Sequence, residues 1–201
     1  MAALIIARHG ESEYSRARLA NGDPSVPVPL TPEGVEEARS LGREIAADPI
    51  EMCITSRFPR ARQTADAALE GRSVRRSVDA RWNDIVYGDF EGKPLDDFHR
   101  WAQTHELDEV VPGGTESRLG VVRRCHAALS DLTRAPEELT LVVCHELLVT
   151  YVLSANERRP PPPLPEEVGK AKPHHLSASE LERAVAFLGD WLATQEASRT
   201  G

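Results

Sequence analysis

The feature that most constrains the fold is the alternation of short apolar segments with longer amphipathic ones. Short runs rich in apolar and β-branched residues predict buried strands at 3–7, 52–55 and 139–144. Helical periodicity of the apolar residues predicts helices at 31–45, 61–69, 116–132 and 147–153. Strands that alternate with helices in this way predict an α/β fold with a largely parallel sheet.

Two local patterns add detail to this architecture. Thr31 and Pro32 stand before the first long helical pattern, as an N-cap residue and a first-turn proline usually do. The segment 74–78 predicts an edge strand, because three polar residues interrupt its apolar character. The remaining predicted strands read as interior strands of the sheet.

Composition excludes several classes of protein. The 201 residues include 24 Lys+Arg and 32 Asp+Glu, and a net charge of −8 argues against binding nucleic acid or an anionic membrane by bulk electrostatics. The three cysteines include no CxxC pair, which fits a reducing compartment and disfavours a zinc site. No apolar run reaches the ~18 residues that span a bilayer. We therefore expect a cytoplasmic, single-domain protein with no nucleic-acid or membrane partner.

The chain is expected to divide into three parts. Residues 1–155 carry the strand–helix pattern and form the predicted catalytic core. Residues 156–176 form a connector in which four consecutive prolines cannot continue a helix, although such a segment could also dock on a proline-binding domain. Residues 177–201 begin with the capping box 177–180 and predict a terminal helix. The simpler expectation is that this helix packs on the core, and the alternative is that it forms an oligomer contact.

Two polar clusters follow the strongest predicted strands. Arg8-His9-Gly10-Glu11 comes after the first strand, and His145-Glu146 comes after the strand that ends at Cys144 and opens a helix. Ligands in open α/β sheets bind at the carboxyl ends of the strands, and helix N-termini attract anions. A histidine beside an arginine at a strand end is nevertheless often structural, and the two histidines meet only if their strands are neighbours.

Two further clusters have both a functional and a structural interpretation. Arg57, Arg60 and Arg62 lie around the junction of a predicted strand and a predicted helix, where they form either a second wall for an anion or a solvated charge run. The segment 84–92 alternates carboxylates with apolar residues, so it is either an exposed turn or a loop that carries a general acid. Aromatic residues cluster around this segment. The simpler interpretation is that they belong to the hydrophobic core and do not form a surface that binds the substrate.

These pieces, in this order, resemble the histidine phosphatase superfamily in its phosphoglycerate-mutase-like branch. Five ordered motifs between about residues 3 and 153 carry the resemblance. They are Arg8-His9-Gly10-Glu11, Leu30-Thr31-Pro-Glu-Gly34, Ser56 with Arg60-Ala-Arg-Gln-Thr-Ala65, Pro112-Gly-Gly-Thr-Glu-Ser117, and Val143-Cys-His145. The resemblance implies a single domain with a mostly parallel central sheet and helices on both faces.

The resemblance also implies a reaction and the residues that perform it. His9 would be the nucleophile, Arg8, Arg60 and His145 would surround the phosphate, and Asp84 would donate a proton to the leaving oxygen. The candidate substrate-binding residues are Gly10, Glu11, Ser15, Gly22 and Glu146. No metal and no cofactor is expected, and the expected partner is a small phosphorylated molecule. A homo-oligomer is compatible with the sequence.

Two departures from the family pattern keep three hypotheses open. Ser15 stands where many members have Asn, and Glu146 replaces the Gly that commonly follows the second histidine. A carboxylate there opposes a dianion unless it turns outward or meets an amino group of the substrate. The leading hypothesis is a metal-independent phosphomonoesterase acting through a phosphohistidine. The alternatives are a phosphoglycerate mutase-type phosphotransferase and a catalytically silent protein that binds a phosphorylated ligand.

Overall fold

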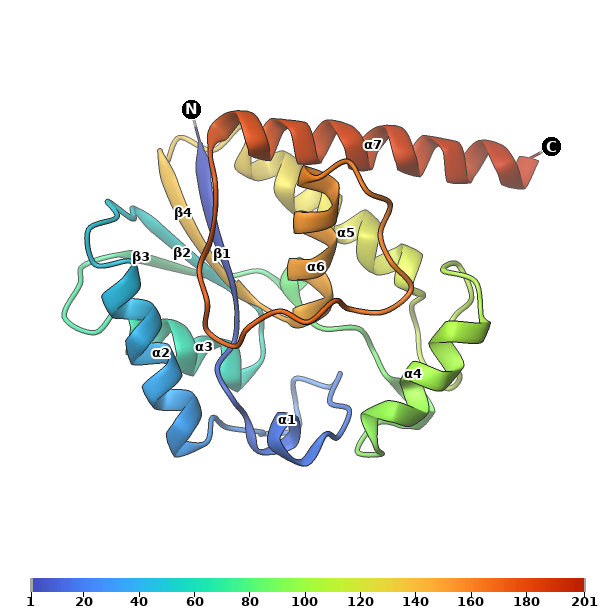
Figure 1. The fold of residues 1–201 in the computed structure, drawn as a ribbon, viewed down its shortest axis with the longest axis horizontal. Helices are drawn as coiled ribbons and strands as arrows, with labels where there is room; N and C mark the ends of the chain where they lie inside the picture. Colours follow the sequence, from blue (N-terminus) through green and yellow to red (C-terminus); the bar gives the residue numbers. More distant parts are fainter. Residues whose placement is uncertain (1, 201) are drawn as a thin grey trace.

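A mostly parallel sheet organises the molecule (Figure 1). The computed structural model describes the backbone of residues 2–200 and the side chains of residues 2–197. In that range five strands lie in the order β3-β2-β4-β1-β5; the first four are parallel, and β5 runs antiparallel beside β1. Their bounds are β1 Ala3–Arg8, β2 Met52–Thr55, β3 Arg75–Val78, β4 Leu139–Cys144 and β5 His174–Leu176. The expected α/β fold with a mostly parallel sheet is confirmed.

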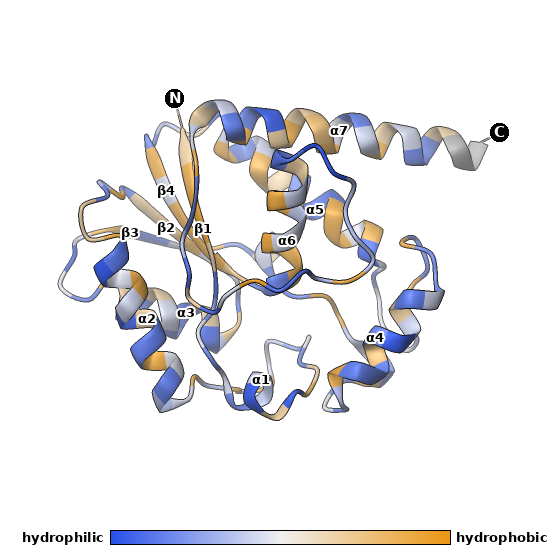
Figure 2. Ribbon diagram, in the orientation of Figure 1, coloured by the Kyte–Doolittle hydropathy of each residue, from blue (hydrophilic) through white to orange (hydrophobic). Residues whose placement is uncertain are grey.

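One face of the sheet is covered by α2 (Pro32–Glu44) and α3 (Pro59–Ala68). Leu41 of α2 and Ala61 of α3 are fully buried in one hydrophobic cluster with Ile5 of β1 and Cys53 of β2. The polar side of α2 faces outward (Figure 2). The hydrophobic effect thus holds this helix pair against the sheet.

The opposite face is covered by α5 (Arg118–Leu132), α6 (Glu146–Asn156) and α7 (Ala178–Thr200). Leu129, Leu148 and Leu188 of these helices share a second cluster with Leu4 and Ile6 of β1. β1 therefore contributes alternate side chains to both clusters, as a central strand of a doubly covered sheet must.

The elements that the sequence predicted are largely where it placed them. β2 and β4 have the predicted bounds, and β3 is an edge strand whose four residues are all exposed. α2 begins after Thr31, whose Oγ1 accepts a hydrogen bond from the Gly34 N–H at 3.0 Å. Local signals sufficed here because caps and periodicities act over a few residues.

Three short or isolated elements were missed by the sequence reading. These are α1 (Glu13–Ala17), α4 (Leu95–Thr104) and β5, and two single-turn 3₁₀ helices also occur at Ala80–Trp82 and Gly88–Phe90. β5 has three residues, two of them histidines, so it carries no apolar alternation. Its pairing with β1, a tertiary contact, makes it a strand.

Residues 157–173, which we call the strap, connect α6 to β5 without regular helix or strand. The strap passes the carboxyl end of β1, where the Ala171 N–H donates to the Arg8 carbonyl at 3.0 Å and Lys170 bridges to Arg8 (Figure 1). After β5, the capping box of Ser177 and Glu180 starts α7. None of the helices in residues 2–200 has the length and apolar character needed to cross a membrane.

Candidate active site

The two histidines meet because their strands are neighbours. β1 pairs with β4 in a register that places Arg8 beside Cys144, and the His9 N–H donates to the Cys144 carbonyl at 3.0 Å. The imidazole rings of His9 and His145 are both buried, with centroids 5.3 Å apart. The condition that the sequence left open is therefore met by the topology of the sheet.

His9 is held in a defined orientation. Its Nδ1 lies 2.7 Å from the Gly10 carbonyl, and its Nε2 accepts a hydrogen bond from Nε of Arg60 at 3.0 Å. Burial lowers the pKa of His9 well below its ordinary value, and Arg60 and Arg8 lower it further. These contacts fit a neutral imidazole with its proton on Nδ1 and a lone pair on Nε2, which is the form of a nucleophile.

Gly10 is required by close packing at the strand end. A Cβ on Gly10 would collide with the backbone carbonyl of Gly34 in the first turn of α2. The Gly10 N–H donates to Oγ1 of Thr64 at 3.0 Å. The absence of a side chain therefore lets β1 approach α2 and α3 closely enough to set the position of His9.

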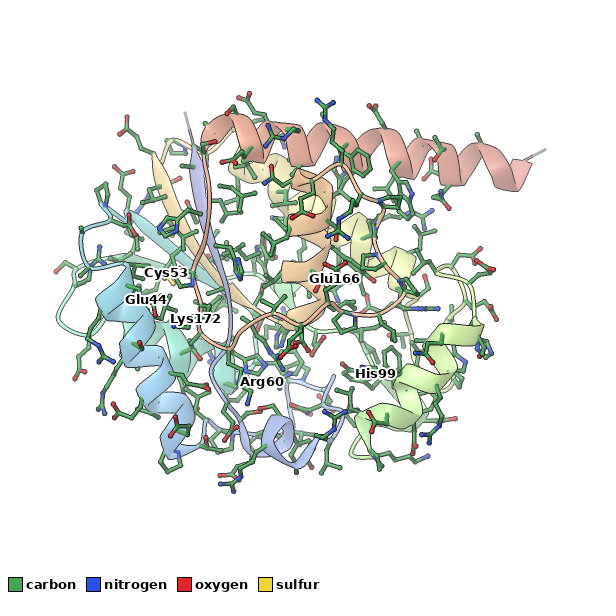
Figure 3. All side chains as sticks on the ribbon, in the orientation of Figure 1. Glu44, Cys53, Arg60, His99, Glu166 and Lys172 are labelled. Carbon is green, nitrogen blue, oxygen red and sulfur yellow. The ribbon has the colours of Figure 1, made fainter. Side chains whose placement is uncertain are left out.

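Arg60 contacts more of these groups than any other side chain of the site; Figure 3 labels it near the lower end of the sheet. It lies in the first turn of α3, is 3% exposed, and donates to the side-chain oxygen of Asn21 and to the Asn21 carbonyl. Its Nη2 also lies 3.2 Å from Nδ1 of His145 and 3.4 Å from Oδ2 of Asp84. One guanidinium thus contacts the nucleophile candidate, the second histidine and the candidate acid.

His145 is fixed from both sides. Its Nε2 lies 2.9 Å from Oγ of Ser56, and its Nδ1 faces Arg60. Burial lowers the pKa of His145 well below its ordinary value, and the charge of Arg60 adds to that effect. A neutral ring with its proton on Nε2 satisfies both neighbours, since an arginine N–H can only donate.

Asp84 lies beside this pair with an altered acidity. Burial raises the pKa of its carboxyl from 3.8 to about 6, against the opposing charge of Arg60. The loop that carries it is held by Arg124, which donates to the carbonyls of Arg81, Asn83 and Asp84. A carboxyl with a pKa near 6 can exchange a proton near neutral pH.

Arg8 and Glu146 form an ion pair across the ends of β1 and β4. Nη1 of Arg8 makes this contact and also donates to the Val168 carbonyl of the strap at 3.3 Å. Nε of Arg8 is buried and has no hydrogen-bond partner. Glu146 therefore contacts the Nη1 side of the Arg8 guanidinium, and the side that carries Nε is left, without a partner, for the candidate phosphate.

The structure separates the remaining predicted substrate-binding residues. Ser15 lines the pocket, whereas Glu11 pairs with Lys170 at 2.7 Å and the Gly22 N–H donates to Glu91 at 2.7 Å. Gly10, Glu11 and Gly22 thus support the wall of the pocket without lining it. Of the clustered arginines 57, 60 and 62, only Arg60 lines it.

These groups open into a cavity of about 540 Å³ between the sheet end, α1, α4 and the strap. The aromatics near Asp84 are core residues, as expected: Trp82, Tyr87 and Phe98 are buried, and Phe90 and Trp101 pack against them. Tyr87 and Phe98 also line the cavity. The sequence did not predict the other lining residues, which are Ser12, Tyr14, Arg18, Leu19, Asn21, Leu95, His99, Leu147, Pro165, Glu167 and Lys170. Ser12, Tyr14, Asn21 and Leu147 adjoin predicted site residues, which is the one signal that could have identified them. Among the described residues, no group of three or more His, Cys, Asp or Glu could hold a metal ion.

Comparisons with known proteins agree with this geometry. The chain is 28% identical to the adenosylcobalamin/alpha-ribazole phosphatase of Salmonella typhimurium over 158 residues, covering 75% of this chain and 77% of that protein. It is 30% identical to the 2,3-bisphosphoglycerate-dependent phosphoglycerate mutase of Azorhizobium caulinodans over 176 residues, covering 79% and 82%. Bacillus stearothermophilus YhfR shares its fold with a TM-score of 0.75 and 25% identity, over 87% of this chain and 90% of that one. The family model for the histidine phosphatase superfamily (branch 1) matches residues 4–184, and this chain belongs to that superfamily.

Proposed function

We propose that this protein is a metal-independent phosphatase that hydrolyses a small phosphomonoester through a phosphohistidine on His9. The observation that carries the proposal is the state of His9, a neutral ring that lines the pocket, with Nδ1 held by a carbonyl and Nε2 accepting a hydrogen bond from Arg60. Phosphoryl transfer depends on in-line positioning and fixed positive donors. Arg8 and Arg60 supply such donors next to the nucleophile.

In the first step, Nε2 of His9 attacks phosphorus and the bond from phosphorus to the leaving oxygen breaks. The Asp84 carboxyl gives its proton to that oxygen, so the leaving group departs as an alcohol. Arg8 and Arg60 donate hydrogen bonds to the phosphoryl oxygens, and His145 helps to position Arg60. A bound dianion raises the pKa of Asp84 beyond the value of about 6 set by burial, which favours the acid form that this step requires.

In the second step, water attacks the phosphohistidine and the bond between nitrogen and phosphorus breaks. The Asp84 carboxylate accepts the proton of the water, and His9 returns to its neutral form. Inorganic phosphate then leaves through the cavity. The same carboxyl thus serves as acid and base in turn, and no step requires a group that the chain does not provide.

The test is phosphate release from p-nitrophenyl phosphate in excess EDTA, comparing the wild type with His9→Ala. We expect activity that survives the chelator and is lost in the variant. His175→Ala is the matched control, because His175 is exposed on β5 and pairs with Asp48 outside the pocket. Activity in His9→Ala equal to that of the wild type would refute the proposal, and activity lost to EDTA would refute its metal independence.

A mutase-type phosphotransferase is the second candidate, and the 30% identity to a phosphoglycerate mutase favours it. Incubation with 3-phosphoglycerate and catalytic 2,3-bisphosphoglycerate distinguishes the two reactions. A mutase forms 2-phosphoglycerate with little free phosphate, whereas a phosphatase releases phosphate. Binding of these compounds with neither product would instead indicate a silent phospho-ligand-binding protein.

A further inference from the structure

The charges on the pocket wall are not arranged for a phosphate alone. Four cationic side chains line the pocket, and each has a carboxylate partner. The pairs are Arg8–Glu146, Arg18–Asp96, Arg60–Asp84 and Lys170–Glu11. Of these carboxylates, Glu146 and Asp84 line the pocket themselves, and Glu167 lines it as a third, so much of the positive charge at the wall is balanced before any dianion enters.

Arg8 and Glu146 can remain paired while a phosphate binds. The side-chain hydrogen bonds of Arg8 to Glu146 and to the strap both use Nη1, whereas its buried Nε has no partner. The edge formed by Nε and Nη2 therefore remains for the phosphate, as in the two-point grip of a guanidinium on an oxyanion. Glu146 does not have to leave, and its carboxylate then stands next to the bound phosphate.

One oxygen of Glu146 is available to the substrate. The contacts of Glu146 within residues 2–197, to Arg8 and to the Val168 N–H, both use Oε1. Glu167, on the strap, lines the same pocket, is exposed, and forms no ion pair with the described residues. Two carboxylates thus line the cavity, one from α6 and one from the strap.

Apolar and aromatic side chains line part of this cavity, beside polar ones such as Ser15 and His99. Leu147 and Pro165 lie on the side of the carboxylates, and Leu95, Phe98 and Tyr87 also line it. Carboxylates together with aromatic faces suit an organic cation, because both attract positive charge and the rings also accept alkyl groups. A second anionic group would meet Glu146 and Glu167 instead.

We propose that Glu146, assisted by Glu167, selects phosphomonoesters whose leaving group carries a positive charge. This inference rests on the proposed phosphatase function and specifies its substrate class. A cationic leaving group offsets the negative charge of the phosphate together with the carboxylates of Glu146 and Glu167 beside it. A cationic leaving group also explains the carboxylate of Glu146 directly after the second histidine, since that carboxylate would oppose a dianionic substrate whose leaving group is neutral.

The test compares phosphocholine with 3,3-dimethylbutyl phosphate, which has nearly the same shape without the charge. We expect wild-type kcat/KM to be at least about tenfold higher for phosphocholine, as one charge-assisted contact provides. Glu146→Gln should reduce this ratio to near one, Glu146→Asp should retain part of it, and Glu167→Gln should lower it partially. Glu166→Gln is the matched control, because Glu166 pairs with Arg159 outside the pocket.

Two results would overturn the inference. A wild-type ratio near one would show that the pocket does not select charge, and an unchanged ratio in Glu146→Gln would assign selection elsewhere. Equal gains for both substrates in Glu146→Gln would mean that Glu146 only restrains Arg8, which also contradicts the inference. Hydrolysis of p-nitrophenyl phosphate separates the two proposals: if it is absent in the wild type, the phosphatase function fails, and if it is present, only the substrate class is in question.

Discussion

Replacing Asp84 with asparagine should remove activity and stabilise the protein at the same time. In the folded protein, burial raises the pKa of Asp84 from 3.8 to about 6. Ionising such a buried carboxyl lowers the free energy of unfolding. This loss grows as the pH rises from 3.8 to about 6 and is constant at higher pH. The difference of about 2 pH units corresponds to about 3 kcal/mol.

An asparagine at this position would carry no such penalty while keeping nearly the same shape. We therefore expect Asp84→Asn to be more stable than the wild type by up to about 3 kcal/mol at pH 8, and by about half of that at pH 5. Loss of the Arg60 contact reduces both figures. For a chain of this length, about 3 kcal/mol corresponds to a rise in Tm of about 6–12 °C, which thermal unfolding followed by circular dichroism measures.

The kinetic half of the prediction depends on the leaving group. An alkyl phosphate requires a proton on its leaving oxygen, whereas p-nitrophenolate is a much better leaving group. We expect Asp84→Asn to lower kcat/KM for an alkyl phosphate by about 10² to 10⁴-fold and to affect p-nitrophenyl phosphate much less. In the wild type, the rate for the alkyl phosphate should fall as the pH rises above the pKa of Asp84, and this decline should be absent in the variant.

The reasoning would be refuted by a variant whose stability relative to the wild type does not depend on pH. It would also be refuted if Asp84→Asn hydrolysed both substrates at wild-type rates. A variant that is inactive and also less stable than the wild type would show that Asp84 is needed for the fold. In that case the attraction of Arg60 stabilises the buried carboxylate more than burial destabilises it. The three outcomes are separated by unfolding and kinetics on the same samples.

Three further changes test the supports of the site and the core. Asn21→Ala removes the side-chain acceptor of Arg60, so kcat/KM for p-nitrophenyl phosphate should fall by about 10²-fold with little change in Tm, and a change under about twofold would contradict this. Arg118→Met leaves the backbone carbonyls of residues 102, 105, 106 and 163 without their donor. Urea unfolding should show that the free energy of unfolding falls by about 3 kcal/mol or more, and a decrease of less than about 1 kcal/mol would contradict the prediction. Leu188→Ala empties a fully buried position of α7 and should lower the free energy of unfolding by about 2–5 kcal/mol, whereas an unaffected protein would show that α7 does not stabilise the core.

Much of the core could be predicted because its signals are local. The strands 52–55 and 139–144 are continuous apolar runs between turns, and the Thr31 cap is read from neighbouring residues. The candidate residues at the ends of β1 and β4 were found for the same reason, since a polar motif directly after a buried strand lies at the edge where parallel strands end. Neither inference needed to know which strands pair.

Other features depend on contacts between distant residues. β5 is too short to be recognised, and it is a strand because Leu4, Ile5 and Ile6 offer the edge of β1 to it. The proline-rich strap was expected to be a connector, yet Pro165 and Glu167 line the pocket. Contacts with two distant residues set its path. Val168 accepts a hydrogen bond from Arg8, 160 residues away, and Lys170 donates one to Glu11, 159 residues away.

Neighbouring residues are enough to specify the α/β class and the set of reactive side chains, because periodicity, capping and strand-end motifs are all short-range patterns. The chemical state of those side chains depends instead on how the chain packs. The neutral form of His9, the raised pKa of Asp84 and the division of Arg8 between Glu146 and a free edge all result from burial and from partners distant in the chain. Burial and the placement of opposite charges are properties of the packed molecule, and no local pattern encodes them.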